Sequence, residues 1–102
     1  NYGCSVYAAS KGAVVAFTKS LALDLAPWVR VNCLCPGDVE TPLVRKQMEE
    51  GGYTMSAMAS IYPMERIGQP EEVAHMICAI LSPMNSFMTG AVVSVDGGLT
   101  AK

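Results

Sequence analysis

The stretch WVRVNCLC at residues 28–35 is short and rich in β-branched and aromatic side chains, and Pro36-Gly37 follows it directly. This composition predicts a strand that ends at the Pro-Gly pair. A helix is predicted over residues 69–81, because it has a proline at its first position and acidic residues in its first turn. A second strand is predicted at residues 91–95. Strand, helix and strand in this order predict a βαβ unit with parallel strands and a right-handed crossover.

Two strands are too few for a parallel sheet, which is normally larger and covered on both faces. We therefore predict an α/β fold in which residues 1–102 form the C-terminal half of a larger doubly wound domain. The chain contains no glycine-rich turn between a strand and a helix, of the kind that binds phosphate groups. The half that would carry such a loop is thus expected to be absent from these 102 residues.

A long apolar helix is predicted before the first strand, over residues 6–26. Ser5 is placed to cap its first turn, and Pro27 cannot continue it. Apolar residues in this helix recur at steps of three and four, which indicates one buried face. The members of that face are Val14, Phe17, Leu21 and Leu25.

Tyr7 and Lys11 lie four residues apart near the start of this helix. Residues at that spacing share a helix face, with their Cβ atoms about 5–6 Å apart. A cation that close favours the ionised phenol, which suits a tyrosine for proton transfer as a general acid or base. The same spacing also fits a structural tyrosine beside a lysine in water. By itself the pair does not separate these two interpretations.

The loop at residues 36–41 follows the carboxyl end of the first predicted strand. In an open parallel sheet, ligands bind in the crevice beyond the carboxyl ends of the strands. Pro36 has no N–H and Gly37 has no side chain, so we expect the backbone to approach a flat ring closely here. Thr41 precedes a proline and is also a good helix cap, and a helix N-terminus attracts phosphate or amide groups.

Residues 42–64 come next. A short helix is predicted over residues 42–50 and ends at Gly51-Gly52, and a methionine-rich segment continues from there to Met64. Methionine is apolar and adaptable, so such a segment beside a ligand crevice suits a mobile lid. The alternative is a loose surface helix that depends on contacts within an oligomer.

The charge pattern argues against nucleic acid as a partner. The formal net charge is −2, and the 7 Lys and Arg residues are scattered without a basic stripe. Charged residues make up 16% of the chain, whereas a soluble domain usually has about 25%. Much of the surface is therefore expected to be covered, either by further chain or by partner subunits.

Residues 73–95 contain no Asp, Glu, Lys or Arg, a length sufficient for a membrane-spanning helix. Polar and turn-forming residues divide this stretch into a helix, a loop and a strand, so we expect no membrane span. The N-terminus shows no basic segment followed by an apolar run, the pattern of a signal peptide. A membrane-associated helix pair remains an alternative that rests on this stretch alone.

The four cysteines, at residues 4, 33, 35 and 78, lack the C-x₂-C type spacing of zinc sites. Cys78 and His75 lie three residues apart on a predicted helix, which would allow a Cys/His site but does not make one. We expect small buried thiols, no bound metal, and a reducing compartment such as the cytoplasm.

Several segments of the chain together resemble one family. These segments are Tyr7-x-x-x-Lys11, Arg30-Val31-Asn32, Pro36-Gly37-x-Val39-x-Thr41, Arg66-x-Gly68-x-Pro70-Glu71-Glu72-Val73, and Thr89-Gly90 leading to Val95-Asp96-Gly97-Gly98. In this order, from about Ser5 to Leu99, they resemble the C-terminal part of a short-chain dehydrogenase/reductase of the 3-oxoacyl-carrier-protein reductase type. The resemblance implies a Rossmann fold, NAD or NADP as cofactor, and hydride transfer between a carbonyl and an alcohol of a small-molecule substrate.

The resemblance also implies a catalytic pair. Tyr7 would exchange a proton with the substrate oxygen. Lys11 would bind the nicotinamide ribose and favour the ionised form of Tyr7. The helix that contains Tyr7, together with the last strand, would lie at the interfaces of a homo-dimer or homo-tetramer, which fits the low content of charged residues.

A cofactor-binding role is implied for the loop after the first strand. Pro36, Gly37 and Val39 would line the nicotinamide, and the Val39 backbone would hold its carboxamide. Thr41 would reach the carboxamide or the phosphates. Residues 42–64 would form the variable substrate lid.

The chain departs from the family pattern because the cofactor loop and the catalytic serine would lie before Asn1. Ser5 and Ser10 stand at the wrong positions to replace that serine. The isolated 102 residues are therefore expected to be inactive. Two hypotheses stay open: an oxidoreductase, or a truncated relative that acts only as an oligomerisation or interaction module.

Overall fold

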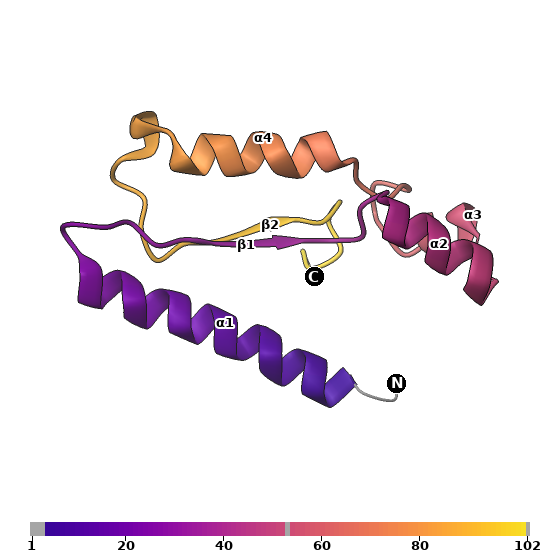
Figure 1. The fold of residues 1–102 in the computed structure, drawn as a ribbon, viewed down its shortest axis with the longest axis horizontal. Helices are drawn as coiled ribbons and strands as arrows, with labels where there is room; N and C mark the ends of the chain where they lie inside the picture. The colour runs from indigo at the N-terminus through magenta and orange to yellow at the C-terminus, as the bar shows by residue number, and fades with distance from the viewer. Residues whose placement is uncertain (1–3, 53, 102) are drawn as a thin grey trace. The chain divides into compact units, whose positions relative to one another are not determined.

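A computed structural model describes residues 4–52 and 54–101 of the chain (Figure 1). The chain divides into two compact units. The first unit contains the described residues up to Cys33 together with residues 82–93. The second contains residues 34–81 together with the described residues from Ser94 onward.

Helices make up most of the regular structure (Figure 1). The first unit contains α1 (Cys4–Leu25) and the short 3₁₀ helix η1 (Pro83–Asn85). The second unit contains α2 (Pro42–Gly51), α3 (Met55–Ala59) and α4 (Pro70–Leu81). The strands are β1 (Cys33–Pro36) and β2 (Val92–Val95).

Strands β1 and β2 pair with each other in a two-stranded sheet. The amide of Cys33 donates to the carbonyl of Ala91 at 2.9 Å, and the amide of Gly37 donates to the carbonyl of Val95 at 3.0 Å. Both bonds have the same offset in residue number, which is the pattern of parallel strands. The order β1, α4, β2 confirms the predicted α/β fold with a helix between two parallel strands.

Strand β1 is shorter than the predicted strand at residues 28–35. The amides of Trp28 and Val29 both donate to the carbonyl of Leu25, at 2.9 and 3.0 Å, so these residues form a turn after α1. Residues 29–32 belong to no strand. The composition of residues 28–35 therefore predicted the strand correctly only at its carboxyl end, and Pro36 is its last residue rather than its stop.

The Asn32 side chain links two distant segments of the first unit. Its Nδ2 donates to the carbonyl of Met88 at 3.1 Å, and its Oδ1 accepts from the amide of Ala91 at 3.0 Å. Beside it, the amide of Gly90 donates to the carbonyl of Val31 at 2.7 Å. A side-chain amide thus takes the place of strand pairing here, which explains why the segments around residues 30–32 and 88–91 lie together.

Helix α1 begins one residue before the predicted cap. Because α1 starts at Cys4, Ser5 lies inside its first turn and is not the N-cap. The end of the helix at Leu25 agrees with the prediction that Pro27 cannot continue it.

The buried face of α1 also differs from the prediction. Phe17 and Val14 are 65% and 53% exposed, whereas Thr18 and Ala22 are buried. A Cβ placed on Gly90 would lie 3.6 Å from the Cβ of Ala22, so these two backbones approach closely. Close approach requires small side chains, and the helix accordingly turns its small residues inward within this unit.

The core of the second unit is small. Its buried apolar residues are Tyr62, Ile67 and Ile80. Ile77 and Leu81 of α4 are exposed, although their spacing with Ile80 is that of one helix face. Within residues 4–52 and 54–101, no helix has the length and apolar character to cross a membrane.

Substituting Asn32→Ala should destabilise the natural protein by about 1–3 kcal/mol, because it leaves the Met88 carbonyl and the Ala91 amide without this partner. Urea unfolding measures the change. Ser20→Ala, an exposed substitution on α1, is the control and should change stability by less than about 0.5 kcal/mol. Equal stability of the two variants would contradict the linking role of Asn32.

Candidate active site

The loop after β1 is fixed by a parallel bridge between Val39 and Gly68. The amide of Gly68 donates to the carbonyl of Asp38 at 2.8 Å, and the amide of Glu40 donates to the carbonyl of Gly68 at 2.9 Å. We call residues 36–41 the bend. The bridge holds the bend against the segment that leads into α4.

The backbone of Val39 itself points the other way. In a parallel pair, the N–H and C=O groups of a residue point opposite to those of its two neighbours. Asp38 and Glu40 use their groups on Gly68, and the Val39 N–H and C=O have no hydrogen-bond partner among the residues that the structure describes. Val39 is half-buried. Val39 therefore offers one unused donor and one unused acceptor, and partly buried backbone groups normally find partners.

Tyr62 holds the other side of the bend. Its hydroxyl accepts a hydrogen bond from the Asp38 amide at 2.7 Å and donates one to Asp38 Oδ2 at 2.8 Å. Only 5% of Tyr62 is exposed. Burial raises the pKa of the Tyr62 phenol, so the hydroxyl keeps its proton and can serve as donor to Asp38.

The space beside Gly37 is occupied by the protein itself. A Cβ added at Gly37 would lie 2.9 Å from Cε1 of Tyr62 and 3.1 Å from the Cα of Asp96. The flat ring that packs against Gly37 on this side belongs to Tyr62, so a ligand ring cannot take the place that the sequence predicted for it here.

Thr41 caps α2, as the sequence predicted. Its Oγ1 accepts a hydrogen bond from the Val44 amide at 3.2 Å, and Pro42 is the first helical residue. Gly52 ends the helix in a left-handed conformation, with φ of 73°. The N-terminus of α2 therefore starts directly at the end of the bend.

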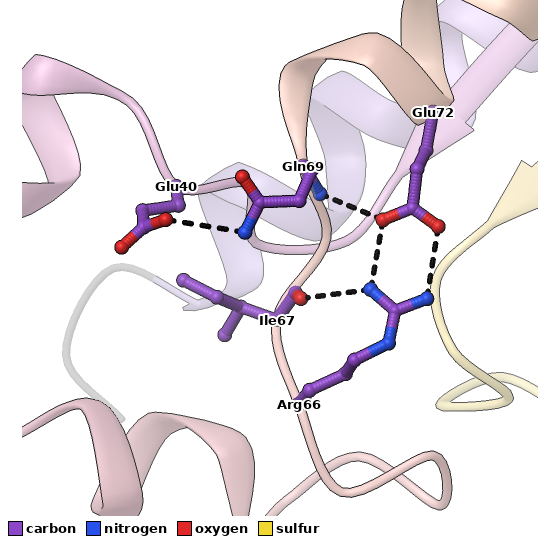
Figure 2. A network of polar contacts seen from close by, with 5 residues as sticks. All are labelled: Glu40, Arg66, Ile67, Gln69 and Glu72. Carbon is purple, nitrogen blue, oxygen red and sulfur yellow. Dashed lines mark hydrogen bonds and ion pairs between the residues drawn. The ribbon is translucent and has the colours of Figure 1, made fainter.

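A network of polar contacts fixes residues 66–69, the connector that leads into α4. Figure 2 shows the two terminal guanidinium nitrogens of Arg66 facing the carboxylate of Glu72. Nη1 donates to Oε1 at 2.7 Å and Nη2 donates to Oε2 at 2.8 Å. Glu72 Oε1 also accepts from the amide of Gln69 at 2.9 Å, as the third helical residue does in a capping box. Gln69 in turn donates to Glu40 Oε2 at 3.1 Å, which connects the start of α4 to the bend.

From the sequence, Arg66 was only part of a motif, Glu72 only part of that motif and one acid of a helix start, and Gln69 had no role. The spacing of Gln69 and Glu72 was a usable signal, because an acid at the third helical position can bond back to the cap residue. Tyr62 gave no such signal, since its partner Asp38 lies 24 residues earlier.

A cavity of about 260 Å³ lies beside the bend. Its lining includes Asp38, Val39, Tyr62, Glu72, Asp96 and Gly97. Its size is below the roughly 300–1,000 Å³ of most ligand pockets. The cavity alone therefore does not define a binding site.

Tyr7 and Lys11 both lie in α1 and both have exposed side chains. One helical turn separates them, so the structure keeps the i, i+4 relation that the sequence predicted. They belong to the first unit, whereas the bend belongs to the second.

The segment at residues 42–64 folds more than the sequence indicated, because α3 caps itself at Thr54 within the methionine-rich part. Neither α2 nor α3 contains a buried residue. A shallow hollow is lined by Gln47, Met48, Glu50, Gly51 and Met58. The described part of this segment is thus loosely packed, as both a lid and a surface helix would be.

The cysteines whose side chains the structure describes are thiols. Cys33 is buried and Cys35 is half-buried, but Cys78 is exposed, so the expectation of buried thiols holds for only part of the set. Cys4 lies outside the side chains that the structure describes. Among the described residues, no group of three or more His, Cys, Asp or Glu side chains could hold a metal ion.

Comparison with known proteins identifies the family. The family model described as enoyl-(acyl carrier protein) reductase matches residues 1–100. A short-chain dehydrogenase of Penicillium roqueforti is 45% identical over 95 residues, which are 92% of this chain and 34% of that protein. The 3-oxoacyl-[acyl-carrier-protein] reductase of Thermotoga maritima is 44% identical over 100 residues, which are 97% of this chain and 39% of that protein. The chain belongs to the short-chain dehydrogenase/reductase family.

Solved structures agree with this assignment. An actinorhodin polyketide ketoreductase variant with NADPH matches with a TM-score of 0.87 and 33% identity, over 100% of this chain and 42% of that one. The ligand-free aldohexose dehydrogenase of Thermoplasma acidophilum matches with a TM-score of 0.84 and 43% identity, over 96% and 42%. The fold is thus part of a doubly wound Rossmann domain. The chain spans well under half the length of the relatives it matches.

Lowering the pH should weaken the connector through Glu72. The hydrogen bonds from Arg66, with that from the Gln69 amide, lower the pKa of the Glu72 carboxyl to about 2, from an ordinary 4.5. A depressed folded pKa gives stability that is present above pH 4.5 and lost as the pH falls towards 2. Glu72→Gln should therefore flatten the fall in unfolding temperature of the natural protein over this range.

The matched control is Glu71→Gln, the neighbouring exposed carboxylate in the same turn of α4. It should leave the acid dependence close to that of the wild type. Added salt should reduce the Glu72 effect, because the pair with Arg66 is partly exposed. Parallel acid curves for the wild type and Glu72→Gln would contradict the role given to this pair.

Proposed function

We propose that the natural protein is an NAD(P)-dependent oxidoreductase that interconverts a carbonyl and an alcohol of a small-molecule substrate. The observation that carries this proposal is the unused N–H and C=O of Val39, whose two neighbours Asp38 and Glu40 are bonded to Gly68. Membership of the short-chain dehydrogenase/reductase family supports the same chemistry. Relatives with NADP or NADPH bound support the choice of cofactor class without deciding between NAD and NADP.

The residues of the bend fit the carboxamide end of a nicotinamide. A carboxamide carries one carbonyl acceptor and an NH₂ donor. The Val39 N–H and C=O are the complementary pair, and Pro36, three residues earlier in the chain, is exposed. Thr41 sits at the N-terminus of α2, where amide or phosphate oxygens are favoured. Gly37 contributes backbone only, because it has no side chain.

We assign proton transfer to Tyr7 and ribose binding to Lys11. The cofactor, when bound, supplies the hydride. Tyr7 exchanges the proton with the substrate oxygen, and Lys11 lies one turn further along α1 on the same face. Exposure of both side chains in α1 supports these roles, because a buried phenol could not reach a substrate.

We assign residues 42–64 to a substrate lid, and the whole chain to the C-terminal half of its domain. The absence of buried residues from α2 and α3 supports a lid, since few contacts have to break when it moves. We further propose a homo-dimer or homo-tetramer in the cytoplasm. Its support is the large apolar side chains that stay exposed, which include Phe17, Leu23, Trp28, Leu81, Met84 and Phe87.

The same exposed apolar side chains favour a second candidate, a non-catalytic module that only associates with partners. Fluorescence titration with NADH and NADPH separates the two candidates. The oxidoreductase predicts saturable binding of at least one dinucleotide by the natural protein. A protein that assembles normally but binds neither dinucleotide would support the module and contradict the enzyme.

Tyr7→Phe should lower turnover at least about 100-fold, because general acid–base catalysis contributes that much or more. The dissociation constant for the dinucleotide should stay nearly unchanged, since the ring is kept. Lys11→Ala should weaken both turnover and binding. The measurements are NAD(P)H absorbance with a panel of carbonyl compounds, and fluorescence titration.

Lys19→Ala, which removes another exposed cation of α1, is the control and should change neither quantity. Normal turnover by Tyr7→Phe would remove Tyr7 from the mechanism. Normal binding by Lys11→Ala would remove Lys11 from the cofactor site.

A further inference from the structure

Residues 42–61 follow the bend in the sequence, and the chain contacts the bend again at Tyr62. The chain departs at Thr41 and returns at Tyr62, whose hydroxyl bonds Asp38. A few residues later, Gly68 bridges to Val39. Burial resumes at the point of return, since α2 and α3 have no buried residue but Tyr62 and Ile67 are buried. Helices α2 and α3 are therefore loosely packed, whereas Tyr62 and Ile67, which follow them, are held in place.

Tyr62 is the strongest connection between this segment and the bend. Among the described residues of 42–64, it is the only one whose side chain hydrogen-bonds to residues 36–40. The other connection is an ion pair between Arg45 and Glu40 at 3.8 Å, in which the Arg45 side chain is 64% exposed. Exposed ion pairs contribute little. Tyr62, in contrast, is only 5% exposed, and its hydroxyl makes two hydrogen bonds to one residue of the bend.

The ring of Tyr62 packs against Gly37 and Gly97. Cε1 lies 2.9 Å from the position of a Cβ on Gly37, and Cδ1 lies 3.5 Å from that on Gly97. Two glycines thus leave the space that the ring fills, one of them with φ of 59°. Tyr62→Phe would keep this packing and remove only the hydroxyl, leaving the Asp38 amide without its partner.

We propose that Tyr62 is a positioning residue that couples the 42–64 segment to the cofactor site, because its hydroxyl sets the path of the backbone that leads from Asp38 to Val39. This inference rests on the proposed function. When a dinucleotide bonds to the N–H and C=O of Val39, the backbone of the bend becomes more rigid. The Tyr62 hydroxyl, which bonds to Asp38 in the bend, then holds the end of the 42–64 segment more firmly. Dinucleotide binding therefore orders α2 and α3, and loss of the hydroxyl breaks that connection.

Limited trypsin digestion of the natural protein tests the coupling without knowledge of the substrate. Lys46 lies exposed in α2 and gives a cleavage site within the segment. In the wild type, saturating NADH or NADPH should slow cleavage after Lys46 at least about threefold. In Tyr62→Phe, this protection should vanish at saturation, and the dissociation constant should rise about tenfold. Cleavage is followed by mass spectrometry, and binding by fluorescence.

Three variants make the result specific. Arg45→Ala removes the exposed ion pair but keeps Lys46 as a cleavage site, and it should retain the protection. Asp38→Asn keeps an oxygen that can accept from Tyr62 and should also retain it. Asp38→Ala removes the acceptor and should lose part of it, and this variant carries the test if Tyr62→Phe fails to fold.

The outcomes separate this inference from the function beneath it. A wild type that binds neither dinucleotide overturns both. A wild type that binds and is protected, while Tyr62→Phe and Asp38→Ala bind and are protected equally well, overturns the coupling and leaves the oxidoreductase intact. Loss of protection in Arg45→Ala as well would assign the effect to general loosening of the segment and overturn the role of the hydroxyl.

Discussion

The backbone of the bend at residues 36–41 is the constraint on which the second unit depends. The Val39–Gly68 bridge fixes it from one direction and the Tyr62 hydroxyl from another. Gly37 is tied to strand β2 through its amide, which donates to the carbonyl of Val95. A short loop would otherwise sample many backbone conformations, and each fixed residue costs about 1–2 kcal/mol in entropy. Because the ties hold this loop in advance, a ligand that binds there does not have to order it.

The polar network behind the bend extends this order to α4. The Glu72 carboxylate accepts hydrogen bonds from the Arg66 guanidinium and from the Gln69 amide, and so fixes the start of the helix (Figure 2). Gln69 reaches on to Glu40 at the end of the bend. One set of bonds thus serves both a helix terminus and a loop. The motif from Arg66 to Glu72 therefore has a structural explanation that does not require any of its residues to touch a ligand.

Local signals in the sequence predicted the helices and strands. Contacts between residues far apart in the sequence decided which side chains are buried and which polar groups bond. Pro70 and Thr41 marked helix starts correctly because capping depends on neighbouring residues. Periodicity failed in α1, where Phe17 is exposed and Ala22 is buried, because the approach of Gly90 decides which face is covered. The sequence did not indicate the bonding partners of Asn32 and Tyr62, since these partners lie 56 and 24 residues away. The site residues were predicted from a motif match, and their roles remain proposals.

The central claim is that the Val39 N–H and C=O have no partner among the described residues, whereas the Asp38 and Glu40 groups on either side bond to Gly68. Amide hydrogen exchange of the natural protein, resolved by residue, tests it most directly. Without dinucleotide, the amides of Asp38, Glu40 and Gly68 should be protected and that of Val39 should exchange rapidly. Saturating NADH or NADPH should then protect Val39. A Val39 amide that is already protected without dinucleotide, or that still exchanges rapidly once a dinucleotide is bound, would contradict the account.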